Sequence, residues 1–313
     1  MQKIRAAVIG VGYLGRFHAQ KYAQAAGCEL VGVVDSRAEA RESVAAELHT
    51  RALAEHGSLL GAVDAVSVVT PTPAHFPIAR EFLEAGAHVL VEKPITETPA
   101  EARALIALAA REQRVLQVGH LERFNSAVLA AEPYLRSPRF VECHRLAPYR
   151  ERGTDVNVVL DLMIHDIDIV QTIVGAPIEA IDAIGTPVFS EGIDIANATA
   201  SRVSVKTERK LRIFEDDAYL SLDLQQKILT VIRKRSPSDG PGPLPVTIEE
   251  QSLEPGDALK AEIDSFLDCI RSARAPVVSG EAGLVALETA MRISEQVERS
   301  LAQRKVSTPT SST

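Results

Sequence analysis

Two separate segments of the chain carry side chains that can exchange protons with a bound molecule. Lys93 lies in the sequence Val-Glu-Lys-Pro directly after a short apolar run, where its ammonium group could donate a hydrogen bond. Asp161 and His165 are four residues apart in an apolar stretch with a helical pattern, so both side chains lie on one helix face. Imidazole is the usual general base near neutral pH, and a carboxylate one turn away can orient it and stabilise its cation. These residue types and their spacing indicate general acid–base chemistry.

Simpler interpretations of the same residues exist. Most lysines are solvent-exposed, and an Asp–His pair on a helix can belong to a cap or to an ion-paired surface. However, Leu162, Met163, Ile164 and Ile167 surround the pair and predict a largely buried segment, in which ionisable groups are costly. A metal centre built from these His and Asp side chains is a weaker alternative, and we expect no metal.

A third polar segment, residues 119–125, follows a strand-like run and joins the two halves of the chain. Small-molecule sites concentrate in clefts between domains, so this segment is a candidate for substrate contact, although a hinge with a helix cap would need similar residues. An acidic protein that binds an anionic substrate also needs local positive charge, which Arg145, Arg150 and Arg152 could supply. The substrate-binding candidates are His120, Arg123, Asn125, Arg150 and His165.

A glycine-rich turn near the start of the chain indicates a nucleotide site. The apolar run 6–9 is followed by Gly10, Gly12 and Gly15 and then by a helical pattern. This order of strand, G-x-G-x-x-G and helix is the dinucleotide-binding fingerprint. The first glycine permits a tight turn, the second lets the pyrophosphate approach the backbone, and the third lets the helix pack closely on the sheet. The helix N-terminus then offers N–H groups and a partial positive charge to the phosphates.

The residues after the second apolar run bear on the choice of cofactor. Asp35 ends the run 30–34, about twenty residues beyond the last glycine, as the fingerprint requires. A carboxylate there can accept hydrogen bonds from both ribose hydroxyls of the adenosine and would repel a 2′-phosphate. We therefore favour NAD over NADP. Arg37 keeps NADP as an alternative, because an arginine at this point can accommodate the phosphate or stack on the adenine.

The elements that must position these residues follow from apolar periodicity. Over the first 120 residues, continuous apolar runs alternate with helical patterns, which predicts a parallel sheet covered on both faces. Ligands of such sheets bind beyond the carboxyl ends of the strands, where residues 70–73 and 92–94 lie. The predicted strands are 6–9, 30–34, 65–70, 88–91 and 115–118. The predicted helices are 38–48, 74–85 and 99–111.

The second half of the chain has a different pattern. Between about residues 178 and 250, several stretches alternate in polarity as antiparallel strands do. We expect an α+β domain with a large antiparallel sheet, packed on helices by one face and able to form a homo-oligomer by the other. Residues 236–245, rich in proline and glycine, are expected to form an exposed loop. The predicted helices are 156–174, 258–272 and 282–302, and the predicted strands include 200–205, 210–214, 219–224 and 228–232.

Length and composition set the broad class. A chain of 313 residues suits two domains, which we place at 1–120 and 121–304, with a disordered tail at 305–313. The net charge of −8 argues against general nucleic-acid binding. No apolar run is long enough to cross a membrane or to form a signal-peptide core, so we expect no membrane association. The three cysteines are widely spaced, which favours the reducing cytoplasm.

Taken together, the motifs resemble the Gfo/Idh/MocA family of oxidoreductases. The resemblance rests on the glycine motif with His18 three residues later, on residues 70–73 and 92–94, and on Asp161 with His165. These motifs occur in the family's order and span nearly the whole chain. The family implies a Rossmann domain, an α+β domain whose open sheet often mediates oligomers, a nicotinamide cofactor and a sugar, polyol or sugar-nucleotide substrate.

The family pattern also assigns residues to the site. Its members often carry glycines just before the catalytic Asp, whereas this chain has residues 155–159 without glycine. The implied catalytic group is Lys93, Asp161 and His165. The implied cofactor-binding residues are Gly10, Gly12, Tyr13, Leu14, Gly15, Asp35, Arg37, Thr70, Pro71, Thr72, His75, Glu92 and Lys93.

Residues 119–125 and 161–168 look most like the bacterial members that oxidise UDP-N-acetylglucosamine at C3. The resulting hypothesis is that His165 takes the hydroxyl proton, Lys93 donates a hydrogen bond to the same oxygen, and hydride passes to NAD⁺. The roles of these two residues could be exchanged. Alternatives are a dehydrogenase of a free polyol such as inositol or of a simple sugar, and a dinucleotide-sensing protein without catalysis.

Overall fold

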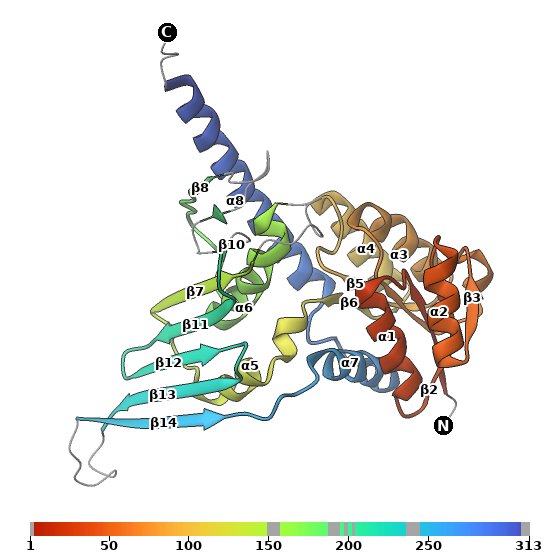
Figure 1. Cartoon of the computed structure of the whole chain (residues 1–313), viewed down its shortest axis with the longest axis horizontal. Helices are drawn as coiled ribbons and strands as arrows, with labels where there is room; N and C mark the ends of the chain where they lie inside the picture. Colours follow the sequence, from red (N-terminus) through yellow and green to blue (C-terminus); the bar gives the residue numbers. More distant parts are fainter. Residues whose placement is uncertain are drawn as a thin grey trace. The chain divides into compact units, whose positions relative to one another are not determined.

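The computed structural model describes residues 3–148, 157–186, 195–196, 200–201, 204–235 and 245–307. It divides into two compact units, and Figure 1 labels their elements. The first unit comprises residues 1–124 and 257–287, and the second comprises residues 125–256 and 288–313. The expected division at residue 120 lies close to the first of these boundaries, but residues 257–287 group with the first unit rather than with the second.

Helix α7 (Ala258–Ser272) explains this grouping. It packs against α1 (Tyr13–Gln24), and its apolar side chains belong to the same hydrophobic core as the first strands. Ile263 and Phe266 are completely buried in that core. The hydrophobic core of the first unit therefore contains side chains from both the N-terminal and the C-terminal parts of the chain.

The first unit is built on a six-stranded parallel sheet of order β3-β2-β1-β4-β5-β6, which confirms the predicted Rossmann architecture. The strand order reverses between β1 and β4, and ligands of such sheets bind at this switch point. Figure 1 shows α1 and α2 against one face and α3 and α4 against the other. The strands are β1 (Ile4–Ile9), β2 (Cys28–Val34), β3 (Arg51–Leu53), β4 (Ala65–Val68), β5 (His88–Glu92) and β6 (Leu116–Gly119).

The remaining helices of this unit agree with their predicted ranges to within one residue. They are α2 (Ala38–Leu48), α3 (His75–Glu84) and α4 (Pro99–Arg111). Helix α4 begins with a capping box, in which Thr98 and Glu101 exchange side-chain and backbone hydrogen bonds. Three single-turn 3₁₀ helices, Gly57–Leu59, Thr72–Ala74 and Leu121–Phe124, follow β3, β4 and β6.

The second unit contains an eight-stranded sheet of order β14-β13-β12-β11-β7-β10-β9-β8. All its pairs are antiparallel except β10 with β7, so the predicted antiparallel sheet is confirmed with one parallel pair. Its helices are α5 (Ser126–Ala131), α6 (Ile164–Val174) and the C-terminal part of α8 (Gly280–Ser307). The strands are β7 (Phe140–Leu146), β8 (Gly185–Thr186), β9 (Ile195–Ala196), β10 (Ala200–Ser201), β11 (Glu208–Phe214), β12 (Ala218–Asp223), β13 (Ile228–Lys234) and β14 (Val246–Ser252).

The prediction missed β7, and part of the predicted strand 200–205 lies outside the described residues. So do nearly all of the expected loop 236–245 and most of the expected tail 305–313. None of the described helices is both long and apolar enough to cross a membrane.

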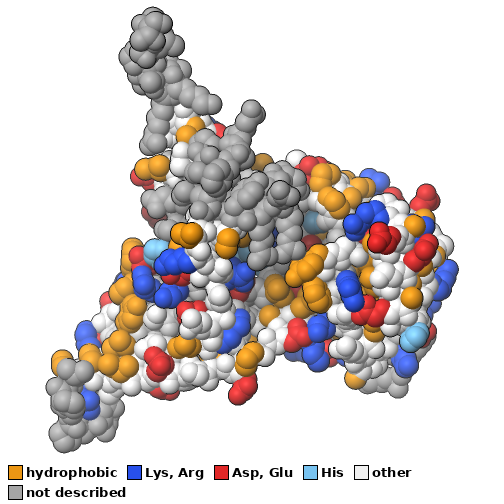
Figure 2. All heavy atoms as spheres, viewed as in Figure 1, with side chains coloured by type: hydrophobic (Ala, Val, Ile, Leu, Met, Phe, Trp, Pro, Cys, Tyr) orange, Lys and Arg blue, Asp and Glu red, His pale blue; other side chains and the backbone are white. Residues whose placement is uncertain are grey.

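One face of this sheet packs on helices and the other does not. Leu211, Ile213, Leu220 and Leu222 are buried in a cluster with residues of α5 and α6. On the opposite face, register places one residue from each of five neighbouring strands in a single cross-strand row. We call it the outer row, and it consists of Phe140, Phe214, Tyr219, Ile232 and Ile248. Figure 2 shows a stripe of hydrophobic side chains over these strands.

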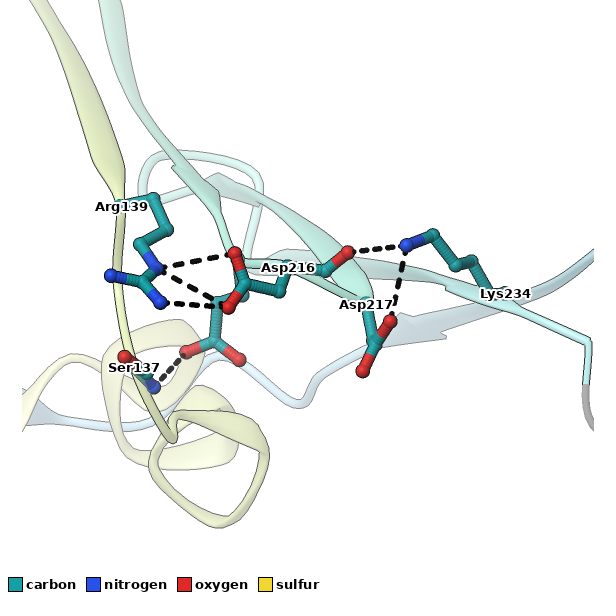
Figure 3. A network of polar contacts seen from close by, with 6 residues as sticks. Ser137, Arg139, Asp216, Asp217 and Lys234 are labelled. Carbon is teal, nitrogen blue, oxygen red and sulfur yellow. Dashed lines mark hydrogen bonds and ion pairs between the residues drawn. The ribbon is translucent and has the colours of Figure 1, made fainter.

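The outer row is flanked by charged groups at the β11–β12 turn, drawn in Figure 3. Arg139 forms a bidentate ion pair with Asp216, with distances of 3.1 Å from Nε to Oδ1 and 2.9 Å from Nη2 to Oδ2. Lys234 reaches the Asp216 carbonyl oxygen and the Asp217 carboxylate. These side chains are exposed, so the pairs add little stability. They give the apolar row a polar border, as protein interfaces have.

Candidate active site

The glycine turn has the close contacts that its sequence predicts. Gly10 has a φ of +87°, and a Cβ on it would lie 2.5 Å from the carbonyl oxygen of Val69. A Cβ on Gly15 would lie 1.8 Å from the carbonyl oxygen of Gly10, so the strand and helix can pack only with glycine there. Gly12 differs, because the nearest atom to its Cβ would be Arg37 Nη2 at 3.5 Å. Its surroundings leave room for a ligand to approach the backbone.

The first turn of α1 is suited to an anion. Gly12 is the N-cap of the helix and provides no side-chain hydrogen bond, and no acidic residue occupies the first turn. The N–H groups of this turn and the helix dipole are therefore available for a phosphate.

Asp35 links the glycine turn to Arg37. Its carboxylate is nearly buried, accepting the Val11 N–H at 3.0 Å through Oδ2 and the Arg37 N–H at 2.9 Å through Oδ1. The Arg37 Nε lies 3.3 Å from Oδ1, while most of that side chain is exposed. A negative charge is thus fixed at the carboxyl end of β2, where the ribose of a dinucleotide would lie.

A cavity of about 790 Å³ opens beside these residues, at the carboxyl ends of β1, β2 and β4. The Thr70 hydroxyl there is buried and has no hydrogen-bond partner within the described part of the chain. A buried hydroxyl without a partner is costly, and a bound ligand would satisfy it. The residues therefore fit a dinucleotide. The predicted residues that line the cavity are Gly10, Gly12, Asp35, Arg37, Thr70 and Pro71.

Several lining residues were not predicted from the sequence. His56 and Glu81 face each other with Nε2 2.9 Å from Oε2, and the cavity also contacts Ala54, Glu55 and Ile78. His56 and Ile78 come from segments that read as an ordinary loop and an amphipathic helix. Only the position of β3 in the sheet brings the loop after it to the cofactor cavity.

The other predicted cofactor residues lie outside this cavity. Tyr13 is exposed and packs edge-to-face on Phe17, 5.3 Å between ring centres, beside a second cavity of about 650 Å³. Leu14 and Thr72 are half-buried, in the first turn of α1 and in the 3₁₀ turn after β4. Their contact with the cofactor stays a prediction.

His75 connects two of the predicted cofactor segments. It is buried, with Nδ1 2.9 Å from the carbonyl oxygen of Pro94 and Nε2 2.8 Å from that of Thr70. Burial lowers the pKa of His75. The two carbonyl groups and the charge of Glu92 raise this pKa and so offset part of the effect. His75 therefore links the loop after β4 to the loop after β5.

Glu92 lies in a buried polar network below Lys93. Its Oε1 is 3.2 Å from His18 Nε2, and its Oε2 accepts the Lys93 N–H at 3.2 Å. His18 Nδ1 lies 3.1 Å from the Ser67 hydroxyl, which in turn lies 2.9 Å from the Tyr22 hydroxyl. His18, Ser67 and Tyr22 are completely buried. The carboxylate that precedes the predicted catalytic lysine is therefore held in place from the interior.

His120 and Arg123 lie near Lys93. His120 is buried, and burial together with the charges of Lys93 and Arg123 lowers the pKa of its imidazole to about 3. His120 is consequently neutral near pH 7. It can exchange hydrogen bonds with a polar ligand but carries no charge to attract an anion.

In the second unit, Asp161 and His165 lie on one continuous helical segment that begins with a wide turn. Residues Val159–Met163 form a π-helical turn, which leads directly into α6. Asn157 starts it, accepting the N–H groups of Val159 and Leu160 at 3.1 Å through Oδ1. Such turns often occur at functional sites. Both Asp161 and His165 are half-buried.

The structure gives two of the predicted substrate-cleft residues partners within the protein and does not describe a third. Arg145 is buried in an ion pair with Asp166, so its expected contribution to an exposed positive patch is wrong. Asn125 caps α5 through Oδ1 and donates Nδ2 to the Leu224 carbonyl at 3.0 Å, which gives it a structural role. Arg150 lies outside the described residues. Within the described residues, no group of three or more His, Cys, Asp or Glu side chains is arranged to hold a metal ion.

Comparison with known sequences places the chain among sugar dehydrogenases. A family model described as "Oxidoreductase family, NAD-binding Rossmann fold" matches residues 4–120. UDP-N-acetylglucosamine 3-dehydrogenase of Acidithiobacillus ferrooxidans is 40% identical over 315 residues, 95% of this chain and 98% of that protein. Inositol 2-dehydrogenase of Rhodococcus erythropolis is 31% identical over 194 residues, 58% of this chain and 56% of that protein.

Solved structures give the same result. A structure of the Acidithiobacillus ferrooxidans enzyme has a TM-score of 0.89 at 39% identity and covers 96% of this chain and 99% of that chain. Levoglucosan dehydrogenase in complex with NADH has a TM-score of 0.84 at 17% identity, covering 95% and 98%, which shows the shared fold. Both the sequence motifs and the architecture of the two units therefore match one group of proteins, and the chain belongs to the Gfo/Idh/MocA family of NAD-binding oxidoreductases.

Proposed function

We propose that this protein is an NAD-dependent dehydrogenase that oxidises UDP-N-acetylglucosamine at C3 to a 3-keto sugar. The observation that carries the proposal is the 40% identity to a UDP-N-acetylglucosamine 3-dehydrogenase over 95% of this chain. Inositol dehydrogenases are more distant, because one that is 31% identical covers only 58% of this chain and one that covers 96% of it is only 25% identical. The similarity to the nucleotide-sugar enzyme thus extends through both units.

The cofactor-binding part of the proposal rests on the first unit. The open backbone at Gly12 and the first turn of α1 would hold the pyrophosphate, and the Asp35 carboxylate would accept the adenosine ribose hydroxyls. Asp35 is already fixed by Val11 and Arg37, so it presents a negative charge that a 2′-phosphate would meet unfavourably. We therefore propose NAD as the preferred cofactor. When bound, its nicotinamide supplies the hydride acceptor.

Lys93, Asp161 and His165 form the catalytic group that we propose. His165 removes the proton of the substrate hydroxyl, and Lys93 donates a hydrogen bond to the same oxygen as negative charge develops on it. Asp161 orients the imidazole from within the preceding turn. Neutral His120 and positively charged Arg123 supply polar contacts to the substrate beside Lys93.

The proposal is tested by incubating the protein with NAD⁺ and a panel of UDP-sugars while following the near-ultraviolet absorbance of NADH. A coupled aminotransferase removes the keto sugar, because its formation can be unfavourable at equilibrium. We expect turnover with UDP-N-acetylglucosamine and little with UDP-glucose or myo-inositol. Preference for inositol would support the polyol alternative, and NAD binding without turnover of any substrate would support a sensor.

We also propose that the protein is a homo-oligomer assembled through the outer row. Phe140 is 60% and Ile248 58% exposed, which is unusual for large apolar side chains on a monomer. The row is continuous over five strands and has a charged border at one end, as the core and rim of an interface have. A second copy related by a two-fold axis could cover it with the same row.

The expected cytoplasmic location stays a proposal. Cys28, Cys143 and Cys269 are all free thiols, as is usual in a reducing compartment. Cys28 and Cys269 are buried, and burial raises the pKa of Cys28 to about 11. These two thiols behave as small apolar side chains rather than as redox groups.

A further inference from the structure

Helix α7 contains a carboxyl group whose position the proposed reaction does not explain. Glu262 is completely buried, and neither of its carboxyl oxygens has a hydrogen-bond partner in the described part of the chain. An ionised carboxylate in such a place costs several kcal/mol even after the structure relaxes, unless it is paired. The group therefore needs a proton, a partner or both.

The space around Glu262 is rich in acceptors. Gln117 on β6 is also completely buried and donates Nε2 to the Glu262 backbone carbonyl at 3.2 Å, while its Oε1 has no partner among the described residues. Two residues further along β6, Gly119 lies opposite Glu92 in the sheet, and a Cβ on it would be 2.7 Å from Glu92 Oε1. Because Gly119 has no side chain, there is room for the Glu92 carboxylate. The side-chain oxygens of Gln117 and Glu262, which have no partner in the described part of the chain, and the Glu92 carboxylate thus lie on three adjoining elements, β6, α7 and β5.

The neighbouring charges disfavour an ionised Glu262. Burial raises the pKa of Glu262 well above its ordinary value, and the negative charge of Glu92 raises it further. Helix α1 faces α7 with Tyr22, whose own pKa is raised by burial, and with His18, which is engaged by Ser67 and Glu92. The other titratable groups on the elements packed against α7 belong to α1 and to the turn after β6. They are Tyr13, which is exposed, Arg16 and Lys21, which are ion-paired with Glu47 and Asp257, and Glu122 and Arg123.

We propose that Glu262 is a protonated carboxylic acid in the folded protein and is a positioning residue for Glu92, donating its proton through one buried water toward that carboxylate. Glu92 then accepts hydrogen bonds from three sides, namely from His18 Nε2, from the Lys93 N–H and from the water that Glu262 holds. A carboxylate held from three sides has one orientation, and the residue that follows it shares that constraint. The consequence for catalysis rests on the proposed function, because it assumes that Lys93 acts on the substrate.

Three variants separate the proton from the shape of the side chain. Glu262→Gln keeps the shape and a donor but cannot ionise, and Glu262→Leu keeps the bulk but has no donor. Asp268→Asn is the matched control, since Asp268 is an exposed carboxylate of the same helix. We expect Glu262→Gln to keep kcat within about twofold and Glu262→Leu to lower it about tenfold with an unchanged KM for NAD, the usual cost of losing a supporting hydrogen bond. We also expect the pH profile of kcat to be shifted in Glu262→Leu and to match the wild type in Glu262→Gln.

The protonation state is measured independently of activity. A folded-state pKa above the unfolded value means that the folded protein keeps a proton that the unfolded chain loses. Stability then falls as pH rises from the unfolded pKa to the folded one. Over that range the unfolding equilibrium constant of the wild type, relative to that of Glu262→Gln, should rise about tenfold per pH unit. The infrared carbonyl band of a protonated carboxylic acid should be present in the wild type and absent from Glu262→Gln.

The outcomes distinguish this proposal from the proposed function. The proposal is overturned if Glu262→Gln loses no carboxylic-acid carbonyl band and its unfolding depends on pH as that of the wild type does. That result would show that Glu262 is ionised. Wild-type kcat and pH profile in Glu262→Leu would overturn the positioning role alone. If the protein turns over no UDP-sugar, the proposed function fails, while the infrared and unfolding measurements still decide the state of Glu262. If Glu262→Leu does not fold, the Gln variant carries both tests.

Discussion

Arg145 and Asp166 form a bidentate ion pair inside the second unit, with Nε 2.8 Å from Oδ2 and Nη2 2.7 Å from Oδ1. Arg145 is 2% and Asp166 5% exposed, so both charges are removed from water. The pair joins β7 to the first turn of α6, one residue after His165. It fixes the start of the helix that carries the predicted base.

Breaking this pair from one side should destabilise the protein strongly. Arg145→Met leaves the Asp166 carboxylate buried and uncompensated, for which we expect a loss of about 3–5 kcal/mol in the free energy of unfolding. Urea denaturation measures this loss. Arg139→Met, at an exposed pair of the same geometry, is the control and should change stability little. Similar losses in the two variants would mean that burial does not set the value of the Arg145 pair.

Removing the proposed catalytic groups should abolish chemistry without abolishing cofactor binding. We expect Lys93→Met and His165→Ala each to lower the single-turnover rate of hydride transfer about 10²–10⁴-fold, the usual contribution of general acid–base catalysis. NAD affinity, measured by titration calorimetry, should stay near the wild-type value. Lys260→Met, on the exposed side of α7, is the control lysine. Full activity in either catalytic variant would exclude that residue from the mechanism.

Two alanine substitutions in the glycine turn should affect different properties, namely stability in one case and NAD binding in the other. Gly15→Ala places a Cβ 1.8 Å from a backbone oxygen, so we expect it to cost about 1–3 kcal/mol or more of stability. Gly12→Ala meets only the flexible end of Arg37 at 3.5 Å and should fold normally but bind NAD more weakly. Thermal denaturation and NAD titration of both variants check this. Normal NAD affinity in Gly12→Ala would argue against the pyrophosphate position that we propose.

The choice between NAD and NADP should depend on the charge of Asp35. Asp35→Asn keeps an oxygen for the Val11 N–H but removes the negative charge that would repel a 2′-phosphate. We expect the kcat/KM for NAD to fall about 10-fold or more, as for the loss of a hydrogen bond to a charged group, and the NADP/NAD ratio to rise. Steady-state kinetics with both cofactors measure the ratio. An unchanged ratio would assign the discrimination to other residues.

The outer row should control assembly. Phe214→Glu places a charge within the row, between Phe140 and Tyr219, and should shift the protein to a smaller species in light scattering after size exclusion. Val277→Glu, an exposed apolar residue of the first unit, is the control. A wild-type monomer, or an oligomer that survives Phe214→Glu, would contradict assembly through this row.

Much of the fold could be predicted from apolar runs, because buried parallel strands and amphipathic helices have strong local patterns. Two strands could not. β3 has three residues, of which Arg51 and Ala52 are exposed, and pairing with β2 alone makes it a strand. β7 carries Glu142, His144 and Arg145, so its sequence lacks the alternation of a half-buried strand. The buried Arg145 depends on Asp166 from another element, which no local pattern encodes.

The candidate site was predictable where it follows chain order and not where it depends on tertiary contacts. Gly10, Gly12, Asp35 and Thr70 lie together around one cavity, since carboxyl ends of parallel strands meet at one sheet edge. Glu92 and His18 are 74 residues apart and become partners only through packing. Glu262 lies in a helix among other charged residues and has the sequence signature of a surface residue. Its burial follows from the docking of α7 on α1.

The wide turn at Val159–Met163 constrains how this protein can vary. A π turn contains one residue more than an α turn, so deleting a single residue there would leave a regular helix. A deletion at Leu162 or Met163 would also reduce the spacing of Asp161 and His165 from four residues to three and so change their relative orientation. We therefore expect substitutions in this segment to be tolerated better than length changes, and the surplus residue to persist among enzymes that use the proposed acid–imidazole pair.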